Sequence, residues 1–590
     1  MNEKFDELYH TDCENDLKID VAIIGAGVSG LYAGYRLLNG KFSDKAEPPK
    51  TVHIFEMSNR IGGRLESVRL PKMDVVGELG GMRYMTSQQI INSLIENVFA
   101  GELKSIDFPM GEPNQHFMYL RQQQFPSDAW QKCQKSGTKF KTHYFLNEDD
   151  QGYSPDQLFD KIVYDVLTKD PWFVEKYGNC VSPVSPYDYE FKLNSQQWDD
   201  IKPNLSYCFE GSPYYKMKVN DIGFWNLIKD QAGQEGYQFL SDAGGYYSNT
   251  INWNAAEAFP YMVGDFSKAG VEYKTIEGGY DRIAYALAKA YCAKPGSQIW
   301  LGNRLETFNV NENSDYRYCL KIHNMQTSSE WYVKTKQIIL ALPRRSLELL
   351  DQYNFFFNPD SAQKLQKSID SIIMEHSYKL LMGFEKPWWL ADFGTTAGES
   401  ITDLPMRQCY YFGVDPQNSH SLFLATYNDM RTTSFWQVIE NATPKKPFQP
   451  KPTKLISTEQ LQEFFKNEKH KDQFSKYQAS EVMVAEAMSQ VRALHSRADI
   501  PEPYIAYYKD WSLDPFGGGY HAWKAGVNVQ EVMKYMRKPV ESESIHICGE
   551  AYSDQQGWVE GALCVAEKML QEHFSIEWPD WLDPKYYLGW

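Results

Sequence analysis

The feature that most constrains the fold of this 590-residue chain is a glycine-rich turn near its start. The turn has the pattern G-x-G-x-x-G, with glycines at Gly25, Gly27 and Gly30. It follows the apolar run 19–24 (IDVAII) and opens a stretch with helical spacing, 28–39 (VSGLYAGYRLLN). In a dinucleotide-binding unit the first glycine permits the tight turn and the second lets the backbone approach a diphosphate, while the third lets helix and strand pack closely.

The next predicted strand supports this interpretation. Residues 51–56 (TVHIFE) end in Glu56, which lies 26 residues after Gly30. An acidic residue at the end of this strand can hold the ribose of an adenosine. The sequence therefore predicts a β-α-β unit with parallel strands and a dinucleotide site.

The segment after Glu56 indicates which dinucleotide is bound. It reads MSNRIGGR and contains Arg60, Gly63 and Arg64. A nicotinamide site has no need for a second glycine pair with a guanidinium here, whereas a flavin site can use Arg64 as a charge partner for the second phosphate. At this point the chain resembles the FAD-dependent amine oxidase family, whose dinucleotide unit continues into an R-x-G-G-R segment. The resemblance implies FAD as the cofactor.

A second segment narrows the resemblance to the L-amino-acid oxidase branch. Residues 77–84 (GELGGMRY) resemble the segment that passes beside the flavin, with Gly81, Met82 and Arg83 at its end. The resemblance implies that Arg83 binds the substrate carboxylate, for which a forked and permanently charged guanidinium is well suited. Monoamine and polyamine oxidases bind substrates without a carboxylate and do not need this arginine.

Two predicted strands resemble the family's catalytic strands. The segment YKLLMGFEKPWW begins at Tyr378 and resembles the strand that bears the active-site lysine, here Lys379. The resemblance implies that Lys379 holds a water near flavin N5, and buried lysines shift their pKa readily. The segment 422–428 (LFLATYN) resembles the strand whose tyrosine, here Tyr427, gives the second contact to the carboxylate.

The C-terminal segment is the most specific. Residues 548–552 (CGEAY) and 557–562 (GWVEGA) resemble the strand, loop and helix that close the flavin site. The resemblance implies that Glu550 accepts a hydrogen bond from the ribityl chain and that the following helix starts under the flavin N1–C2=O edge, where a helix N-terminus stabilises negative charge. It also implies that the Gly557 carbonyl receives the substrate amine and that Trp558 forms an aromatic wall opposite Tyr427.

Shorter matches complete the expected site. Residues 277–284 (EGGYDRIA) resemble a family turn, Leu305 stands at an adenosine contact, and 511–515 (WSLDP) resembles a segment lining the substrate side chain. The expected catalytic residues are Lys379, Arg83, Tyr427 and Trp558, and the expected substrate-binding residues are Arg83, Tyr427, Gly557 and Trp558. The expected cofactor-binding residues are Gly25, Gly27, Gly30, Glu56, Arg60, Gly63, Arg64, Gly81, Met82, Arg83, Leu305, Gly549, Glu550, Trp558 and Val559; no metal is expected.

Charge and cysteine content limit the partners. With 60 Lys and Arg against 77 Asp and Glu, the net charge is −17, which disfavours nucleic acid. Nine cysteines without C-x-x-C spacing argue against a zinc site or disulfide framework and fit a reducing compartment. No apolar run suggests a membrane span or a secretory signal, so we expect a cytoplasmic protein, with secretion left open if the chain is a processed form. The family often dimerises, which leaves a homodimer open.

We predict an α/β fold (α+β overall) in which a Rossmann-like FAD-binding domain is interleaved with a mixed-sheet substrate domain and a mostly helical insert. Residues 1–16 have the composition of a polar tail, and 441–455 that of a Pro- and Lys-rich surface loop. The expected boundaries are 17–84, 265–346 and 538–575 for the FAD-binding domain, 85–115 and 347–537 for the substrate domain, and 116–264 for the insert.

The predicted function is FAD-dependent oxidation of L-amino acids to 2-oxo acids, with release of ammonia and hydrogen peroxide. Hydride transfer from Cα to N5 needs orientation and a neutral amine more than a strong base. Three alternatives stay open: an L-amino-acid 2-monooxygenase, an amine or polyamine oxidase, and a flavin-binding protein without redox turnover. If Asp429 or Asp242 faces the pocket, the substrate is lysine or arginine.

Overall fold

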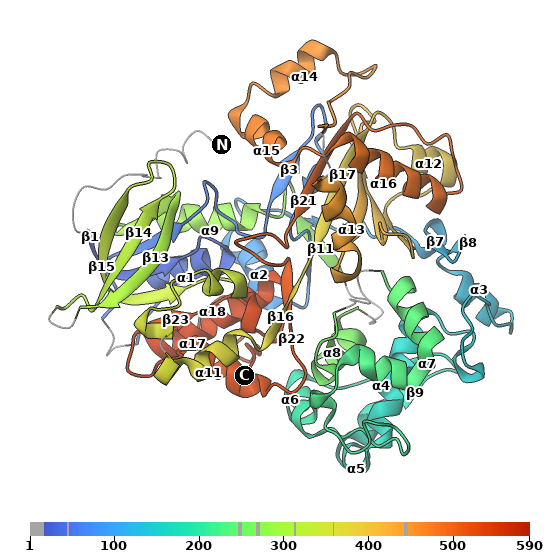
Figure 1. The fold of residues 1–590 in the computed structure, drawn as a ribbon, viewed down its shortest axis with the longest axis horizontal. Helices are drawn as coiled ribbons and strands as arrows, with labels where there is room; N and C mark the ends of the chain where they lie inside the picture. Colours follow the sequence, from blue (N-terminus) through green and yellow to red (C-terminus); the bar gives the residue numbers. More distant parts are fainter. Residues whose placement is uncertain are drawn as a thin grey trace.

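The computed structural model describes residues 17–43, 47–245, 251–266, 272–311, 314–357, 359–441 and 446–590 (Figure 1). The polar tail predicted for residues 1–16 lies outside this range, as do residues 442–445 of the Pro- and Lys-rich stretch. The rest of that stretch, from 446 to 455, contains no helix and no extended strand. No helix in the described segments is long and apolar enough to cross a membrane. Eight cysteines are described, and all are free thiols.

The first sheet carries the predicted β-α-β unit. Its strand order is β12-β2-β1-β15-β14-β13, and β23 pairs with β15. The strands β12, β2, β1, β15 and β23 run parallel, whereas β13 and β14 add an antiparallel edge. Their bounds are β1 (Leu17–Ile24), β2 (Val52–Glu56), β12 (Ser297–Leu301), β13 (Asn303–Val310), β14 (Tyr318–Asn324), β15 (Glu330–Leu340) and β23 (Ile545–Ile547). The predicted Rossmann-like α/β architecture is confirmed.

The local sequence explains why this unit forms. Strand β1 is buried on both faces, as an apolar run in a parallel sheet requires. The chain turns at Gly25, whose φ of +105° favours glycine, and enters helix α1 (Val28–Asn39). A Cβ atom on Gly30 would lie 2.0 Å from the Gly25 carbonyl oxygen, so only glycine lets α1 start this close to the turn. A buried ion pair of 2.8 Å between Arg36 and Glu567 joins α1 to helix α18 (Val559–Phe574).

The second sheet has the strand order β21-β17-β20-β19-β18-β7-β8. It is mixed, because β18 pairs with β7 in parallel and its other pairs are antiparallel. Strands β7 and β8 come from the range 116–264, which we expected to be mostly helical, so the proposed insert also contributes two strands to this sheet. The domain boundaries remain our proposal. The strand bounds are β7 (Phe117–Leu120), β8 (Gln123–Pro126), β17 (Tyr378–Phe384), β18 (Gly398–Thr402), β19 (Gln408–Val414), β20 (Ser421–Asn428) and β21 (Ile505–Asp510).

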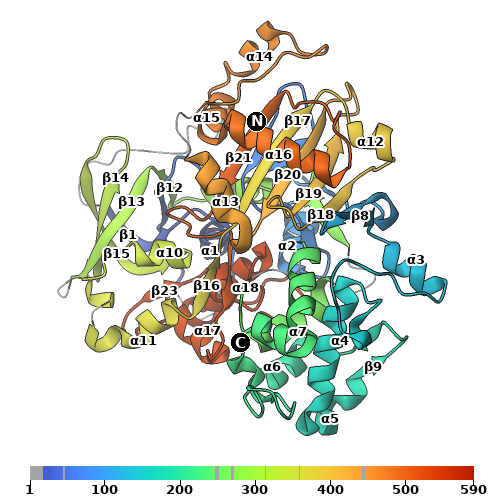
Figure 2. The same ribbon diagram turned by 45° about the vertical axis from the view of Figure 1, so that its right-hand side comes forward.

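A helical part follows β8 and has its own apolar core. Its first long helix begins at a capping box, in which the Ser154 hydroxyl accepts from the Gln157 backbone and the Gln157 side chain accepts from the Ser154 backbone. In both views this part lies at the opposite end of the molecule from α14 and α15 (Figures 1 and 2). Its helices are α4 (Pro155–Lys169), α5 (Pro171–Tyr177), α6 (Ser195–Asn204), α7 (Phe224–Ala243) and α8 (Ala255–Pro260), with the short strands β9 (Val181–Pro183) and β10 (Tyr189–Phe191).

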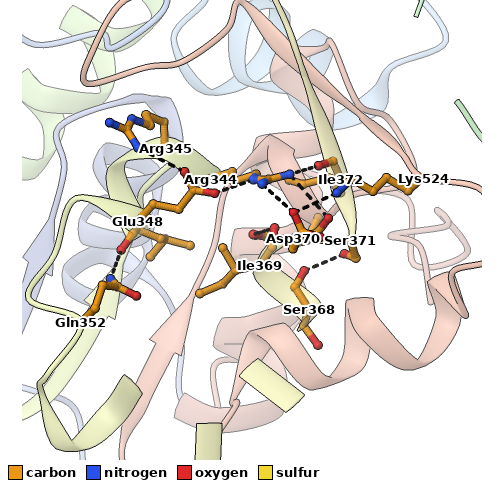
Figure 3. A network of polar contacts seen from close by, with 12 residues as sticks. Arg344, Arg345, Glu348, Gln352, Ser368, Ile369, Asp370, Ser371, Ile372 and Lys524 are labelled. Atoms are coloured by element: carbon orange, nitrogen blue, oxygen red, sulfur yellow. Dashed lines mark hydrogen bonds and ion pairs between the residues drawn. The ribbon is translucent and has the colours of Figure 1, made fainter. Parts of the chain in front are cut away.

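A two-stranded ribbon of β16 (Ile372–Glu375) and β22 (Tyr520–Trp523) is tied to the first sheet. Helix α10 (Arg344–Glu348) follows β15, and Arg344 donates to Asp370 at 2.7 Å (Figure 3). Lys524 also pairs with Asp370, at 2.8 Å, so the ribbon is fixed beside the end of β15. Strand β16 ends at Glu375, and β17 begins at Tyr378.

The remaining elements connect these parts. They are β3 (Ser67–Arg69), β4 (Val76–Glu78), β5 (Tyr84–Met85), β6 (Ser105–Asp107), β11 (Tyr273–Ile276), α2 (Gln89–Ser93), α3 (Ala129–Lys135), α9 (Arg282–Cys292), α11 (Pro359–Ile369), α12 (Trp388–Phe393), α13 (Met430–Glu440), α14 (Thr458–Phe464), α15 (Glu468–Tyr477), α16 (Glu481–Leu494) and α17 (Val529–Arg537).

Candidate active site

A cavity of about 830 Å³ is lined by residues of both large sheets and brings the expected site residues together. Gly30 is not among its described lining residues, which agrees with the packing role expected for the third glycine. The expected residues that line it are Gly25, Gly27, Glu56, Arg60, Gly63, Arg64, Gly81, Met82, Arg83, Leu305, Lys379, Tyr427, Gly549, Glu550, Gly557, Trp558 and Val559.

Two helix N-termini open onto this cavity. Helix α1 has Gly27 at its N-cap and α18 has Trp558, and neither has a side-chain hydrogen bond to cap it. The first backbone N–H groups of a helix need an acceptor, and the N-terminus attracts negative charge. Because the cavity wall includes Gly27, Val28, Trp558 and Val559, an anionic ligand could be held at both helix ends.

The end of the cavity that is lined by the glycine-rich turn and Glu56 is called the nucleotide end below. There, Glu56 is held by backbone donors. Its Oε2 accepts from the Ala26 N–H at 2.9 Å, and its Oε1 accepts from the Ser58 N–H at 2.9 Å. A carboxylate oxygen can accept more than one hydrogen bond, so this fixed carboxylate can still accept from a ribose hydroxyl. Arg60 instead stabilises its own loop, because its guanidinium donates to the carbonyls of Gly63 and Leu65.

Glu550 joins three segments that are far apart in the chain. It pairs with Arg64 at 2.8 Å and accepts from the His521 backbone at 2.8 Å and from the Gly557 backbone at 3.0 Å. Burial raises the pKa of Glu550, but Arg64 and His521 outweigh burial and lower the pKa to about 2. Arg64 also donates to the Gly519 carbonyl at 3.0 Å. The ribityl role expected for Glu550 and the phosphate role expected for Arg64 remain predictions; the structure has the two side chains paired with each other.

Lys379 is buried on β17 and faces the segment that carries Arg83. Its ammonium donates to the Gly80 carbonyl at 2.6 Å and lies 4.5 Å from the centre of the Tyr427 ring. Burial lowers the pKa of Lys379 to about 7, although Glu78 opposes this shift. Because this value is close to neutral, Lys379 can change its charge in the physiological range.

Sequence reasoning missed Glu78, which lies beside Lys379. Its carboxylate accepts from the Tyr280 backbone at 2.7 Å and from the Ser67 hydroxyl at 2.8 Å. Burial raises the pKa of Glu78 well above its ordinary value. An acidic residue inside the glycine-rich segment GELGG was the one available signal.

Arg83 lies in an aromatic surrounding on the cavity wall. It is 8% exposed, and its guanidinium lies 4.1 Å from the centre of the Tyr273 ring and 5.1 Å from that of Phe108. It also donates to the Met110 sulfur at 2.8 Å. Such contacts stabilise a cation without neutralising it.

Aromatic side chains surround the same end of the cavity. Besides Tyr427 and Trp558, the wall includes Tyr261, Tyr410 and Tyr520, which sequence reasoning missed because no motif contains them. Gly557 has φ +86°, and a Cβ atom there would lie 3.3 Å from the Tyr520 ring, so this loop packs against the ribbon. The lining residues of the WSLDP segment are Trp511, Asp514 and Pro515.

The two acidic residues considered for a basic substrate are paired elsewhere. Asp429 pairs with Arg407 at 2.9 Å, and both side chains are almost fully buried. Asp242 pairs with Arg431 and accepts from the Tyr144 hydroxyl at 2.7 Å. Neither acid is among the described lining residues, and each has an arginine partner, so the condition for a lysine or arginine substrate is not met by them.

The cavity suits FAD in its shape and chemistry. A Cβ atom on Gly63 would lie 3.1 Å from the Gly27 Cα, so two glycine backbones meet where a diphosphate would approach. The Tyr280 hydroxyl is buried at the cavity and has no hydrogen-bond partner in the part of the chain that the structure describes. Backbone donors, the Glu56 carboxylate and the Tyr280 hydroxyl thus lie along one cavity, where each could bind a part of FAD.

Comparison with known proteins agrees with this geometry. Residues 23–97 match the NAD(P)-binding Rossmann-like domain model, and residues 212–442 match the model of the flavin containing amine oxidoreductases. The chain is 26% identical to Aplysianin-A of Aplysia kurodai, over 96% of this chain and 92% of that protein. It is 23% identical to Achacin of Lissachatina fulica (94% and 93% covered) and 22% identical to L-amino-acid oxidase 4 of Hebeloma cylindrosporum (97% and 84% covered).

Solved structures show the same fold. Wild-type putrescine oxidase bound to putrescine superimposes with a TM-score of 0.57, at 16% identity, over 95% of this chain and 99% of that chain. The chain is thus a flavin-binding oxidoreductase of the Rossmann-like class. Its resemblance to the flavin amine oxidase family, and to the L-amino-acid oxidase branch of that family, is confirmed, and FAD is its cofactor.

Proposed function

We propose that this flavin amine oxidase oxidises L-amino acids. An L-amino acid, oxygen and water are converted to a 2-oxo acid, ammonia and hydrogen peroxide. When bound, FAD would supply the redox chemistry, which is a two-electron oxidation at Cα with oxygen as the final acceptor. The chain's own residues bind and orient the substrate and exclude water.

The observation that carries the proposal is the buried Arg83 on the cavity wall. Its guanidinium lies 4.1 Å from the centre of the Tyr273 ring and 5.1 Å from that of Phe108, and it donates to the Met110 sulfur. A cation at a largely aromatic end of a cavity favours a ligand that brings a negative charge, and a carboxylate matches the guanidinium fork. We propose that Tyr427 gives the second contact to that carboxylate.

The remaining groups would orient the amine and Cα. The Gly557 carbonyl would accept from the amine, because the Trp558 N–H of the same peptide donates to the Gln555 carbonyl at 3.3 Å and so fixes the orientation of that peptide. Trp558 and Tyr427 would hold Cα between two rings, which keeps the reacting atoms in line. Lys379, with a pKa of about 7, would carry a water or donate a proton beside the reacting centre.

One alternative is an amine or polyamine oxidase. The structural likeness to putrescine oxidase concerns the fold, and an amine substrate would bring no carboxylate to the Arg83 guanidinium. A second alternative is a 2-monooxygenase, which would bind the carboxylate through Arg83 and Tyr427 in the same way and would differ in its products.

Anaerobic mixing with each of the twenty L-amino acids, followed by absorbance near 450 nm, tests the proposal. We expect the flavin band to bleach with some L-amino acids and not with their D-enantiomers. Mass spectrometry of the aerobic products then separates a 2-oxo acid from an amide. Bleaching by amines alone, or an amide product, would replace the proposal by the corresponding alternative.

A further inference from the structure

The loop 553–558 carries the two residues to which the proposed function assigns the amine and the aromatic wall, Gly557 and Trp558. Near Glu550 it is held by two hydrogen bonds, each of which joins a side chain to a backbone group. Gln556 donates to the Ala551 carbonyl at 2.6 Å, and the Gly557 N–H donates to Glu550 at 3.0 Å. These contacts hold the end of the loop, at Gln556 and Gly557. Asp554, at its beginning, is held by contacts with the helical part.

The beginning of the loop is bound by the helical part. Lys202, on α6, lies 3.4 Å from Asp554 Oδ1 and 2.9 Å from Glu257 Oε2, on α8. The side chains of Lys202, Asp554 and Glu257 are 8%, 13% and 6% exposed. Lys202 therefore forms a buried ionic bridge between the helical part and the loop, across 352 residues of sequence.

The acidic side chains around Lys202 favour its charged form. Burial opposes the charge on Lys202, but Asp554, Glu257 and Asp199 surround it and raise its pKa. Burial also raises the pKa of Asp199, to about 6. One lysine thus compensates several buried acids, and its removal would take away the cation that pairs with Glu257 and Asp554, which is costly in a buried site.

The C-terminal segment closes the same cluster. The Tyr587 hydroxyl donates to Asp199, and the Tyr586 hydroxyl donates to Glu560 at 2.7 Å. Gln555, inside the loop, donates to the Tyr586 hydroxyl at 3.4 Å. The loop is therefore held by the helical part and by the end of the chain at once.

The helical part has little other access to the cavity. Among the described lining residues, Tyr261 is the one that comes from the range 116–264. We infer that Lys202 is a positioning residue: through Asp554 it sets the loop that presents Gly557 and Trp558, and so couples the helical part to substrate binding. This inference rests on the proposed function for the role of the loop.

The experiment compares Lys202→Met, Lys202→Arg and Asp554→Asn as FAD-loaded proteins. The anaerobic bleaching assay gives the half-saturating amino-acid concentration and the limiting rate. We expect Lys202→Met and Asp554→Asn each to raise the half-saturating concentration about tenfold or more with unchanged FAD content, and the double variant to be no worse than either. Lys202→Arg should stay within about threefold of wild type.

Lys176→Met is the matched control, because Lys176 pairs with Asp200 at 2.5 Å near the same helix but is about half exposed. We expect it to bind substrate as wild type does. If Lys202→Met does not fold, Asp554→Asn decides alone, since it keeps the pair between Lys202 and Glu257. The inference is overturned if Asp554→Asn has the same half-saturating amino-acid concentration as wild type. It is also overturned if Lys202→Met loses thermal stability and binds substrate as wild type does.

A second readout needs no substrate. Visible circular dichroism of the bound FAD reports the surroundings of the flavin, and a displaced Trp558 should change its spectrum in Lys202→Met and Asp554→Asn but not in Lys176→Met. If wild-type protein is bleached by no amino acid, the proposed function fails while this spectrum still tests the inference. An unchanged spectrum in both variants overturns it.

Discussion

The two ends of the cavity are built in different ways. The nucleotide end is made of contiguous segments whose backbone we propose to bind the cofactor: the Gly25–Gly30 turn, the end of β2 at Glu56, and the loop from Arg60 to Arg64. The substrate end is made of single side chains from distant segments, such as Arg83, Tyr410, Tyr520 and Trp558. A backbone site needs glycines at fixed spacing, whereas a side-chain site needs only that the fold brings the right residues together.

This contrast predicts separable defects. Variants at the nucleotide end should lose FAD without changing which substrates are accepted. Variants at the substrate end should keep FAD and change the substrate response. Some residues, such as Glu550, are shared by both ends. A variant at any other residue that loses FAD and also changes which substrates are accepted would contradict this separation.

The largest effect is expected for Gly30→Val. The Cβ atom would meet the Gly25 carbonyl oxygen at 2.0 Å, so α1 must move away from the turn. We expect a loss of about 3 kcal/mol or more in the free energy of unfolding, or no folded protein at all, and little bound FAD. The ratio of absorbance at 450 and 280 nm together with urea unfolding measures both.

Gly101→Ala is the control for this change, because a Cβ atom on Gly101 meets nothing within 4 Å. It should keep FAD and stability. A Gly30→Val protein with full FAD content would refute the close-packing argument.

Lys379→Met should reduce the oxygen reaction, by roughly 100-fold if Lys379 acts as a positioned donor. Because the pKa of Lys379 is about 7, its charge is lost as the pH rises through 7. The wild-type rate of recovery of the flavin band on mixing with oxygen should therefore fall above pH 7, and the variant should be slow at every pH. A variant with the wild-type pH profile would exclude Lys379 as the titrating group.

The same pKa predicts the pH dependence of stability. The pKa of a lysine in an unfolded chain is about 10.4, so the unfolded state binds more protons than the folded state between pH 7 and about 10. The free energy of unfolding should rise with pH across this window for wild type, relative to Lys379→Met. Urea unfolding at pH 7, 8 and 9 measures the difference, and equal slopes would contradict the buried, shifted lysine.

The smallest effect is expected for Arg345→Ala. Arg345 pairs with Asp514 at 2.7 Å beside the cavity, but the two side chains are 34% and 59% exposed. Exposed pairs contribute about 1 kcal/mol or less. Thermal unfolding should shift little and the half-saturating substrate concentration should change less than about twofold; a larger change in that concentration would make this pair part of the substrate end.

Much of the nucleotide end was predictable because its physical constraints are local. A turn with φ above zero and a helix close to a strand demand glycine, so Gly25 and Gly30 mark the fold in the sequence. The predicted strands around 19–24 and 51–56 correspond to β1 and β2 for the same reason. Resemblance to a family supplied Arg83, Lys379 and the GWVEGA segment.

The rest depends on long-range pairing, which leaves no local pattern. Arg407, which pairs with Asp429, lies 22 residues before it, directly ahead of β19, and Lys202 lies 352 residues from Asp554. Strands β7 and β8 were assigned to a helical range because β7 joins the sheet through β18 (Gly398–Thr402), which lies far away in the chain, and β8 pairs with β7. Tyr520 lines the cavity through the same kind of distant pairing, because it lies on β22 opposite Glu375 of β16.

The central claim is that Arg83 selects a carboxylate-bearing substrate, and one paired measurement tests it. Wild type and Arg83→Lys are mixed anaerobically with the L-amino acid that bleaches wild type best and with the amine left when that amino acid loses its carboxylate. We expect the amino acid to bleach wild type and the amine to do so at best weakly, while Arg83→Lys needs roughly 100-fold more amino acid because the bidentate fork is lost. Bleaching by the amine as readily as by the amino acid, with an Arg83→Lys variant like wild type, would contradict the claim.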